Sequence, residues 1–502
     1  LFLVACKTLR SNALQVRLCN QHLGNLKILR ANRPPIIVGS FRSFRHYCNQ
    51  TDPGLLFSVA TKIMFLRHRL SLLSKRHLTF NNNNTVAVAC RHATTVSKRH
   101  KILSTTAQAM PRSGIRDVMD AAWALEKELV PPQRLIHLEV GQPDFPPPAS
   151  VLAETSHALL TNAKLSAYIP NAGLPELRTA VAEHHNNAGT TTTPPLASDN
   201  VVVCHGAVGA VATLLQATLE PGDEILLPDP GWVNYEMATK ILGGVPVTYP
   251  LDVALGWKPD PATIADLCTA NTKAIVLCSP SNPTGSCLSK AEMTALLEVA
   301  NERGLLVISD EIYAQIYFNG TDKEASSPSI MECENVDVER TAIVSGVSKA
   351  WAMTGFRVGW IVTHNVELAE TCAKLSEASI SCGVPFAQHG ALVALTSKDD
   401  LVSGMVDEYK VRRNKAVSVL KEFGKFEYSP EGAFYILIHM GGSTDAVDFC
   451  KRFLKEHHVA ISPGSAFGEV AKEYVRVSLA SSLEDIEEGV RRLCDFIEKE
   501  KR

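Results

Sequence analysis

Apolar runs of strand length alternate with segments of helical periodicity from about residue 113 to the end of the chain. The predicted strands are short and largely apolar, at 201–204, 224–227, 274–278, 305–308, 341–344 and 358–362. Strands that are apolar throughout, with helices between them, are typical of a largely parallel sheet buried on both faces. The pattern therefore predicts an α/β fold with helices on both sides of the sheet.

Several helices in this region have recognisable ends. One helix is predicted over 207–219, and another over about 290–303 stops at Gly304, a residue type that often ends helices. The last helix is predicted to begin at Ser482, with Asp485 three residues on as a capping box. Its buried face would carry apolar residues at helical spacing: Ile486, Val490, Leu493 and Ile497.

The first 112 residues differ from the rest in charge and pattern. Residues 1–116 carry 19 of the 50 lysines and arginines but one of the 52 acids (Asp52), so the other 386 residues hold 31 bases and 51 acids. A basic, hydroxyl-rich, acid-poor leader is typical of a transit peptide, which would direct the protein to a plastid or mitochondrion. A disordered tail of a cytoplasmic protein remains an alternative. A second alternative is that part of the segment is an artefact of an incomplete gene model, because the chain begins with Leu1. Met64 opens a stretch that would make a plausible start of a targeting sequence.

Composition excludes several classes of function. The acidic body argues against binding to nucleic acid or to an anionic membrane. No apolar stretch reaches the ~18 residues that a membrane-spanning helix needs. The 13 cysteines are scattered without a CxxC pair, so neither a disulfide framework nor a metal site is expected.

Unusual polar or glycine-rich turns follow five of the predicted strands. In an open parallel sheet, ligands bind beyond the carboxyl ends of the strands, so these five turns predict one shared site. The turns are HGAVGA (205–210), PDPGWVNY (228–235), SPSNPTG (279–285), SDEIY (309–313) and SGVSKAWAMTGFRVGW (345–360).

These motifs, in this order and spacing, resemble those of the pyridoxal-phosphate-dependent aminotransferases of fold type I, class I/II. The resemblance covers about residues 113–502. It implies a large domain over 153–388, with a mostly parallel seven-stranded sheet covered by helices on both faces. A smaller α+β domain would combine 113–152 with 389–502, and the substrate would bind between the two domains.

The resemblance implies the catalytic residues. Lys349 matches the lysine that forms a Schiff base with pyridoxal 5′-phosphate, and a neighbourhood that lowers its pKa would favour this reaction. Asp310 matches the aspartate that pairs with the pyridine nitrogen and keeps the ring electron-poor. Tyr313 and Asn282 match the residues that hydrogen-bond the phenolic oxygen of the cofactor.

A second group matches the residues that hold the rest of the cofactor. Arg357 would bind the phosphate through its planar fork, together with the backbone N–H groups of Ala207 and Val208 at a helix N-terminus. By their positions in the chain, Ser345 and Ser348 are further candidates to bind the phosphate.

Two aromatic residues complete the implied cofactor site. Trp232 matches the aromatic that stacks on the pyridine ring. Tyr168, in YIPNAGLPELR, matches a tyrosine that reaches the phosphate of the neighbouring subunit. The resemblance therefore implies a homodimer with shared active sites.

The substrate would be held by residues from both domains. Arg476, in YVRVS, matches the arginine that binds the substrate's α-carboxylate, and Gly141, in LEVGQPDF, matches the glycine whose backbone approaches the same group. Trp232 and Asn282 would also contact substrate. We find no basic residue within 381–388 placed to bind a second carboxylate; Arg112 and Arg116 are candidates for that role.

The leading interpretation is a transaminase that moves an amino group between an L-amino acid and a 2-oxo acid by a ping-pong Schiff-base mechanism. Aspartate, glutamate, alanine and aromatic amino acids all remain possible donors. A carbon–sulfur lyase or an aminocyclopropane-carboxylate synthase would share most of these motifs. A third alternative is a regulatory protein in which an aminotransferase-like domain follows an N-terminal DNA-binding module.

Overall fold

The computed structural model describes residues 102–110, 114–187, 193–320, 326–442 and 445–500. The basic leader predicted over 1–112 therefore lies almost wholly outside the described residues, and so does Arg112. None of the described helices has the length and apolar character needed to cross a membrane.

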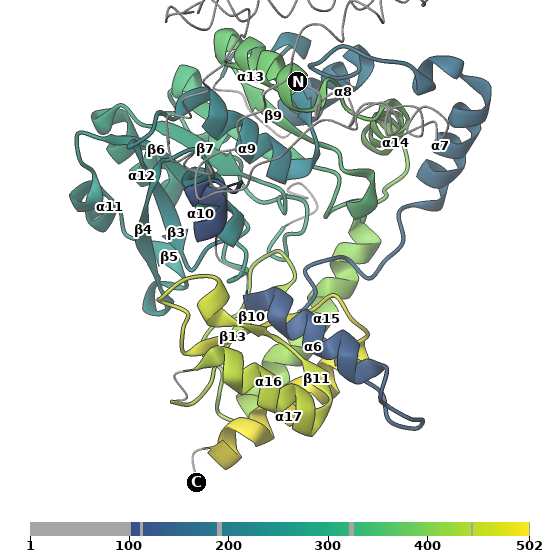
Figure 1. The fold of residues 1–502 in the computed structure, drawn as a ribbon, viewed down its shortest axis with the longest axis vertical. Helices are drawn as coiled ribbons and strands as arrows, with labels where there is room; N and C mark the ends of the chain where they lie inside the picture. The colour runs from purple at the N-terminus through teal and green to yellow at the C-terminus, as the bar shows by residue number, and fades with distance from the viewer. Residues whose placement is uncertain (1–101, 111–113, 188–192, 321–325, 443–444, 501–502) are drawn as a thin grey trace, which may run out of the picture. The chain divides into compact units, whose positions relative to one another are not determined.

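Helices and strands alternate along the described chain (Figure 1). The α-helices are α5 (Thr105–Ala109), α6 (Gly114–Glu126), α7 (Ala149–Thr161), α8 (Pro175–Asn187), α9 (Gly206–Thr218), α10 (Val233–Ile241), α11 (Pro261–Leu267), α12 (Lys290–Arg303), α13 (Val366–Ile380), α14 (Pro385–Thr396), α15 (Ser403–Glu422), α16 (Ala446–His457) and α17 (Leu483–Glu500). The strands are β1 (Ile136–His137), β2 (Val201–Cys204), β3 (Glu224–Asp229), β4 (Val245–Asp252), β5 (Lys258–Pro259), β6 (Thr272–Cys278), β7 (Leu306–Asp310), β8 (Thr341–Gly346), β9 (Gly359–Thr363), β10 (Tyr435–His439), β11 (Val459–Ala460), β12 (Ser462–Pro463) and β13 (Tyr474–Ser478).

The largest sheet has the strand order β2-β9-β8-β7-β6-β3-β4-β5. It is mostly parallel, as predicted, and the exceptions are β9 and β5, which run antiparallel to their neighbours. The predicted number of seven strands is wrong by one. The additional strand, β5, has two residues and forms where the chain returns beside the end of β4, too short to leave a periodic signal.

Alternate residues of the strands point to opposite faces of this sheet, and each face has its own hydrophobic core. On one face Val202, Ile225 and Val276 pack with α9, α10 and α13. On the other face, Val203 and Leu226 pack with α8, α12 and α14. Helices therefore cover both faces, which leaves the edge formed by the strand ends as the place where polar side chains can gather.

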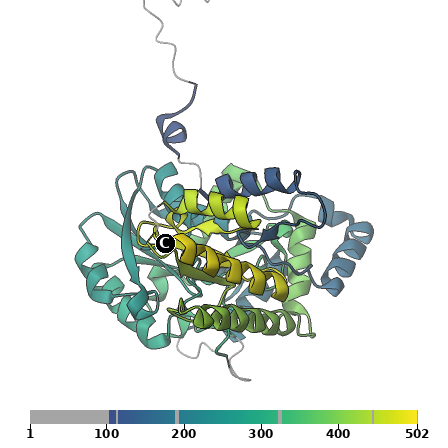
Figure 2. The same ribbon diagram turned by 90° about the horizontal axis from the view of Figure 1, so that it is seen from below.

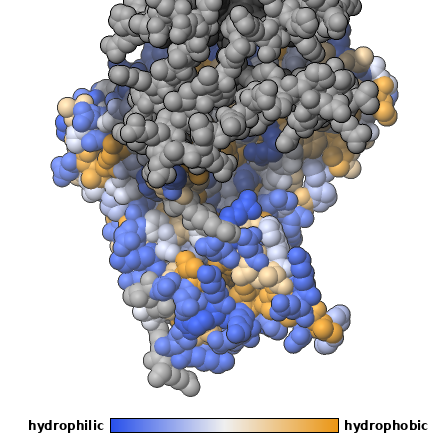
Figure 3. Space-filling model, in the orientation of Figure 1, coloured by the Kyte–Doolittle hydropathy of each residue, from blue (hydrophilic) through white to orange (hydrophobic). Residues whose placement is uncertain are grey.

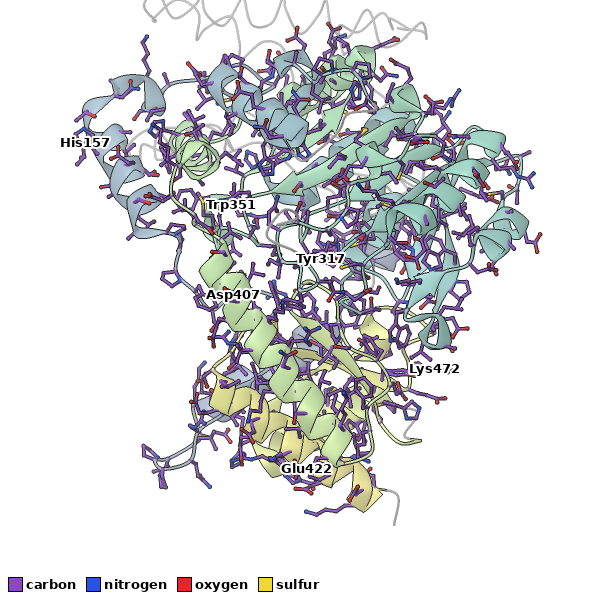
Figure 4. All side chains as sticks on the ribbon, turned by 180° about the vertical axis from the view of Figure 1, so that it is seen from behind. His157, Tyr317, Trp351, Asp407, Glu422 and Lys472 are labelled. Atoms are coloured by element: carbon purple, nitrogen blue, oxygen red, sulfur yellow. The ribbon has the colours of Figure 1, made fainter. Side chains whose placement is uncertain are left out.

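A second, smaller sheet lies toward the C-terminus, with the order β10-β13-β12. It packs with α15, α16 and α17 in a third hydrophobic core, to which α6 contributes Val118. Figure 4 shows α15 running from the side of the large sheet, near Asp407, to these C-terminal elements, near Glu422. Seen from below, α15 and α17 lie side by side (Figure 2), where Arg491 donates two hydrogen bonds of 2.8 Å to Glu422.

The surface over these C-terminal elements is mainly hydrophilic (Figure 3), in keeping with a single buried face on each helix. In α17 that face includes the four apolar residues predicted from the sequence. The Ser482 hydroxyl accepts the Asp485 N–H at 3.1 Å, which confirms the predicted helix start. The predicted helix over 290–303 is α12, and Gly304 follows it in the left-handed conformation with φ 66°. The division into a large and a small domain stays a prediction.

Candidate active site

A cavity of about 380 Å³ opens at the edge of the large sheet where five strands end. Strands β2, β3, β6, β7 and β8 all point the same way, because β9 runs antiparallel between β2 and β8. Most of the site residues predicted from the sequence line this cavity: Gly141, Ala207, Val208, Trp232, Asn282, Asp310, Tyr313, Ser348, Lys349, Arg357 and Arg476.

Lys349 lies in the connection between β8 and β9, on the wall of the cavity. Its Nζ donates a hydrogen bond of 2.6 Å to the Gly141 carbonyl and lies 5.5 Å from the centre of the Tyr313 ring. Burial, reinforced by the positive charges of Arg476 and Arg357, lowers the pKa of Lys349 to about 8. The amine is therefore closer to its neutral, nucleophilic form than a surface lysine would be.

Asp310 is the last residue of β7 and is 2% exposed. One carboxylate oxygen accepts the Tyr235 hydroxyl at 2.5 Å, and the other accepts the Ile312 N–H at 3.1 Å. Burial raises the pKa of Asp310 to about 6, although both hydrogen bonds and the charge of Lys349 act to lower it. A carboxylate held in this way is ready to pair with a cationic group inside the cavity.

Arg476 comes from the small sheet, where β13 lies between β10 and β12. Its guanidinium is 3% exposed and donates to the Glu139 carbonyl at 2.7 Å and to Asn282 Oδ1 at 3.2 Å. Its Nε is buried and has no hydrogen-bond partner among the described residues. The guanidinium packs over the Tyr435 ring, 4.3 Å from its centre. A buried arginine with donor capacity to spare is suited to bind a carboxylate.

Tyr313, Gly141 and Trp232, three further predicted residues of the cavity, each lie close to a tyrosine. The Tyr313 and Tyr435 hydroxyls form a hydrogen bond of 2.9 Å. A side chain at Gly141 would place its Cβ 2.7 Å from the Tyr435 hydroxyl, so this backbone can approach the cavity only as glycine. Trp232 meets Tyr235 edge-on, with the ring centres 5.3 Å apart.

The N-terminus of α9 and Arg357 form an anion-binding arrangement. Gly206 has a φ of 70°, and a Cβ there would lie 2.6 Å from Arg357 Nη2. A Cβ at Gly359 would lie 2.6 Å from the Ala207 backbone nitrogen. The two glycines thus let a guanidinium approach the first N–H groups of a helix, a combination that suits a phosphate.

Two predicted cofactor residues do not line the cavity. Ser345 is buried within β8, and its hydroxyl donates to the Glu311 carbonyl at 3.3 Å. Tyr168 follows the short helix Ala163–Ser166 and is 87% exposed. Of the two basic residues considered for a second carboxylate, Arg116 is exposed on α6 and does not line the cavity.

Sequence reasoning missed half of the residues that line the cavity, among them Tyr235, Tyr435 and Glu139. Tyr235 stands three residues after Trp232, in a motif already singled out, so its place on the same helical turn was a usable signal. Tyr435 and Glu139 had no such signal, because their places depend on how the small sheet packs against the rest. No group of histidines, cysteines and acids among the described residues could hold a metal ion.

The chain is similar to known proteins in sequence and in fold. Residues 133–493 match the family described as aminotransferase class I and II. The chain is 34% identical over 372 residues to an aspartate aminotransferase of Bacillus subtilis, covering 73% of this chain and 92% of that protein. The crystal structure of Thermotoga maritima aspartate aminotransferase matches 79% of this chain and 100% of its own, with a TM-score of 0.72 and 32% identity. The Thermus thermophilus aspartate aminotransferase with maleate gives the same coverage, a TM-score of 0.72 and 32% identity.

Proposed function

The chain belongs to the class I and II aminotransferases, and from this membership we propose how its cavity holds cofactor and substrate. The protein is a transaminase of the fold type I architecture. Nothing in the comparisons favours the carbon–sulfur lyase or the regulatory protein that the sequence left open.

The cofactor is pyridoxal 5′-phosphate, and three regions of the cavity fit its three functional groups. Lys349 would bind the aldehyde, and the carboxylate of Asp310 would pair with the protonated ring nitrogen. Arg357 and the N-terminus of α9 form the phosphate site, supported by the close approach that Gly206 and Gly359 permit. When bound, the cofactor supplies an aldehyde that takes up an amino group and a ring that withdraws electrons from the substrate's Cα.

The neighbouring residues tune and cover this cofactor. Asn282 and Tyr313 would hydrogen-bond its phenolic oxygen, and Trp232 would stack on its ring. Ser348 lines the cavity and would contact the phosphate. Ser345 is withdrawn in β8 and supports the turn through the Glu311 carbonyl.

Arg476 binds the α-carboxylate of the substrate, and the backbone of Gly141 lies beside the same group. Because the pKa of Lys349 is lowered to about 8, its amine reaches the neutral form more readily than the amine of a surface lysine. A neutral Nζ would take the proton from the amino donor's Cα and pass it to the cofactor carbon that bore the aldehyde, and the second half of the ping-pong cycle would run this transfer in reverse. Arg476 fixes the substrate so that this proton lies within reach.

The working unit is a homodimer. The exposed Tyr168 side chain, which the resemblance assigns to the neighbouring subunit's phosphate, supports this proposal because its 87% exposure leaves it accessible to a second chain. The proposal is tested by measuring the mass in solution and the cofactor affinity of the wild-type and Tyr168→Phe proteins. Loss of cofactor affinity in an intact dimer is expected, and a fully active monomer would contradict it.

A single observation supports the assignment most strongly: the Lys349 amine lines the same cavity as Asp310 and Arg476. Protein loaded with pyridoxal phosphate should be treated with borohydride and its peptides mapped by mass. The modification is expected on Lys349 and on no other lysine, including the exposed Lys374 of α13. A tag elsewhere, or none, would contradict the proposal.

A further inference from the structure

A loop over residues 464–473 connects β12 with β13, the strand that carries Arg476. The base of the loop is closely packed, since a Cβ at Gly464 would lie 2.1 Å from the Ala471 carbonyl oxygen. Phe467 of this loop is buried and lines the cavity, and the Arg476 guanidinium carbon lies 4.7 Å from the centre of its ring. The position of the loop therefore decides where one of the aromatic rings around the proposed α-carboxylate site lies.

The large sheet holds this loop through Asp229, the last residue of β3. Asp229 Oδ2 accepts the Glu469 N–H and Oδ1 accepts the Val470 N–H, both at 3.1 Å. Two residues after Asp229, the Gly231 N–H donates to the Phe467 carbonyl at 2.7 Å. Three hydrogen bonds thus join the end of β3 to the loop, and one of them is made by the residue whose ring meets the guanidinium.

The contact between the loop and Asp229 is shaped for a carboxylate. Asp229 is buried, and a Cβ at Gly468 would lie 2.0 Å from its Oδ1, so the loop can pass this close only as glycine. Burial raises the pKa of Asp229, whereas the N–H groups of Val470 and Glu469 act to keep it ionised. A carboxylate offers an acceptor oxygen to each of the two N–H groups, and an amide of the same shape has only one.

Asp229 lies between two neighbours with different proposed tasks. Trp232, three residues later, belongs to the proposed cofactor site, whereas the loop that Asp229 holds packs against Arg476 of the proposed substrate site. Asp229 itself does not line the cavity, so any effect that it has on the substrate is indirect.

We propose that Asp229 is a positioning residue for the substrate: it holds Phe467, whose ring in turn fixes the Arg476 guanidinium for the α-carboxylate. This inference rests on the proposed function, because Arg476 is the proposed carboxylate site, and it adds a residue to that site. Loss of the contact between Asp229 and the loop should weaken the binding of amino acids and leave the binding of the cofactor intact.

The first experiment compares Asp229→Asn with the wild type as purified, cofactor-loaded full chains. Aspartate, glutamate, alanine and phenylalanine are compared as donors, and the best donor of the wild type is kept. Its half-saturating concentration in the donor half-reaction is expected to rise about tenfold, while the saturating rate changes less than about threefold. Asp260→Asn is the matched control, because that carboxylate also accepts two backbone N–H groups, those of Ala262 and Thr263, at the start of α11.

The outcomes of this experiment separate the two proposals. An unchanged half-saturating concentration in a folded Asp229→Asn protein overturns the positioning role and leaves transamination intact. An equal rise in Asp260→Asn also overturns the positioning role, because the effect would then belong to any lost carboxylate contact. No reaction of the wild type with any of the four donors overturns the proposed function as well.

A second readout needs no turnover. The 2-methyl analogue of the best donor has no hydrogen on Cα, so it binds without passing a proton on, and the absorbance of the loaded protein follows its binding. Its dissociation constant is expected to rise about tenfold in Asp229→Asn, whereas that of pyridoxal phosphate, measured by equilibrium dialysis, should change less than about twofold. An equal loss of cofactor affinity would mean that Asp229 acts through Trp232 and would overturn the proposal.

A variant of the loop gives the same test if Asp229→Asn does not fold. Gly468→Ala keeps Asp229 but pushes the loop away from it, and it should raise the half-saturating concentration of the donor about tenfold. Gly442→Ala is the control for backbone strain, because its φ of 116° is also positive and a Cβ there meets nothing within 4 Å. Equal effects of the two variants would contradict the positioning role.

A double-mutant cycle tests the route through Phe467. Phe467→Leu removes the ring that meets Arg476, so little should be left for Asp229 to position. In the Phe467→Leu background, Asp229→Asn is expected to raise the half-saturating concentration by less than about threefold, against about tenfold in the wild type. A full tenfold effect in both backgrounds would show that Asp229 does not act through this ring, and the proposal would fail.

Discussion

The edge of the large sheet and the small C-terminal sheet contribute to the cavity in different ways. At the large sheet, the site residues stand at or just after strand ends that are paired in register. Cys278 of β6 lies beside Asp310 of β7, and Asp310 lies beside Val344 of β8. The polar residues that follow these strands are therefore neighbours because the strands are neighbours.

At the small sheet, Arg476 stands within β13, flanked by Leu437 and Ser462 on the adjoining strands. Its partners, the Glu139 carbonyl and Asn282, come from distant parts of the chain. The first region, the proposed cofactor site, is thus positioned by the pairing of neighbouring strands, whereas the second, the proposed substrate site, depends on contacts between distant segments. Variants in the two regions should therefore fail in different assays.

The largest expected effect is that of Lys349→Ala, because one amine serves both attachment and proton transfer. We expect kcat to fall by about 10⁴-fold or more. The Arg357 and Asp310 sites remain, so the variant should still bind pyridoxal phosphate noncovalently, as equilibrium dialysis would measure. Lys374→Ala on the exposed face of α13 is the matched control and should leave both quantities unchanged. Normal turnover in Lys349→Ala would end the cofactor assignment.

The same comparison explains which site residues could be predicted from the sequence. Strand ends are visible as a change from apolar to polar residues, so the motifs that contain Lys349, Asp310 and Asn282 could be located. The family resemblance then singled out these three residues. The strand β4 was not predicted, since Pro246 and Pro250 argue against a strand. It forms beside the two-residue β5, near the sheet edge, where prolines are tolerated.

Residues whose place depends on packing between distant segments could not be predicted in this way. Tyr435 meets Tyr313 only when the small sheet packs against the segment that follows β7, and 122 positions separate the two tyrosines. Glu139 lies beside a two-residue strand with no periodicity of its own. The predicted leader gives no further information, since it lies almost wholly outside the described residues.

The next largest effect separates the two regions directly. Arg476→Lys keeps a positive charge but loses the planar fork, so kcat/KM for amino acids should fall by about 100-fold while cofactor affinity is unchanged. Arg357→Lys should show the opposite pattern, with weaker cofactor binding and a smaller effect on substrate KM in saturated enzyme. Steady-state kinetics and equilibrium dialysis on both variants test this. The same pattern in both would show that the two regions do not act separately.

A smaller effect is expected from Gly206→Ala, which tests the phosphate site. The new Cβ would lie 2.6 Å from Arg357 Nη2 and would displace the guanidinium. Affinity for pyridoxal phosphate should fall about tenfold, and affinity for pyridoxal, which lacks the phosphate, should fall less. Gly222→Ala is the control for backbone strain, because its φ of 97° is also positive but a Cβ there meets nothing within 4 Å. Equal losses for both ligands would contradict a phosphate site here.

The smallest effect concerns Tyr235, the hydrogen-bond donor to Asp310 that the sequence did not reveal. The ionised form of Asp310 should pair with the cofactor, so affinity should decrease as the pH falls through about 6, the pKa of Asp310. The Tyr235 hydroxyl stabilises the ionised form, and Tyr235→Phe should therefore raise that pKa further. The pH at half-maximal cofactor affinity should move upward by about one unit.

The matched control is Tyr249→Phe. It also removes a buried tyrosine hydroxyl, but one that donates to the Val276 carbonyl at 2.6 Å. Any titration of the cofactor's own groups is common to both variants, so only the difference between their midpoints reports on Asp310. Cofactor titrations from pH 5 to 8 measure that difference. Coincident midpoints would show that Tyr235 supports the fold of the strand end without holding the charge of Asp310.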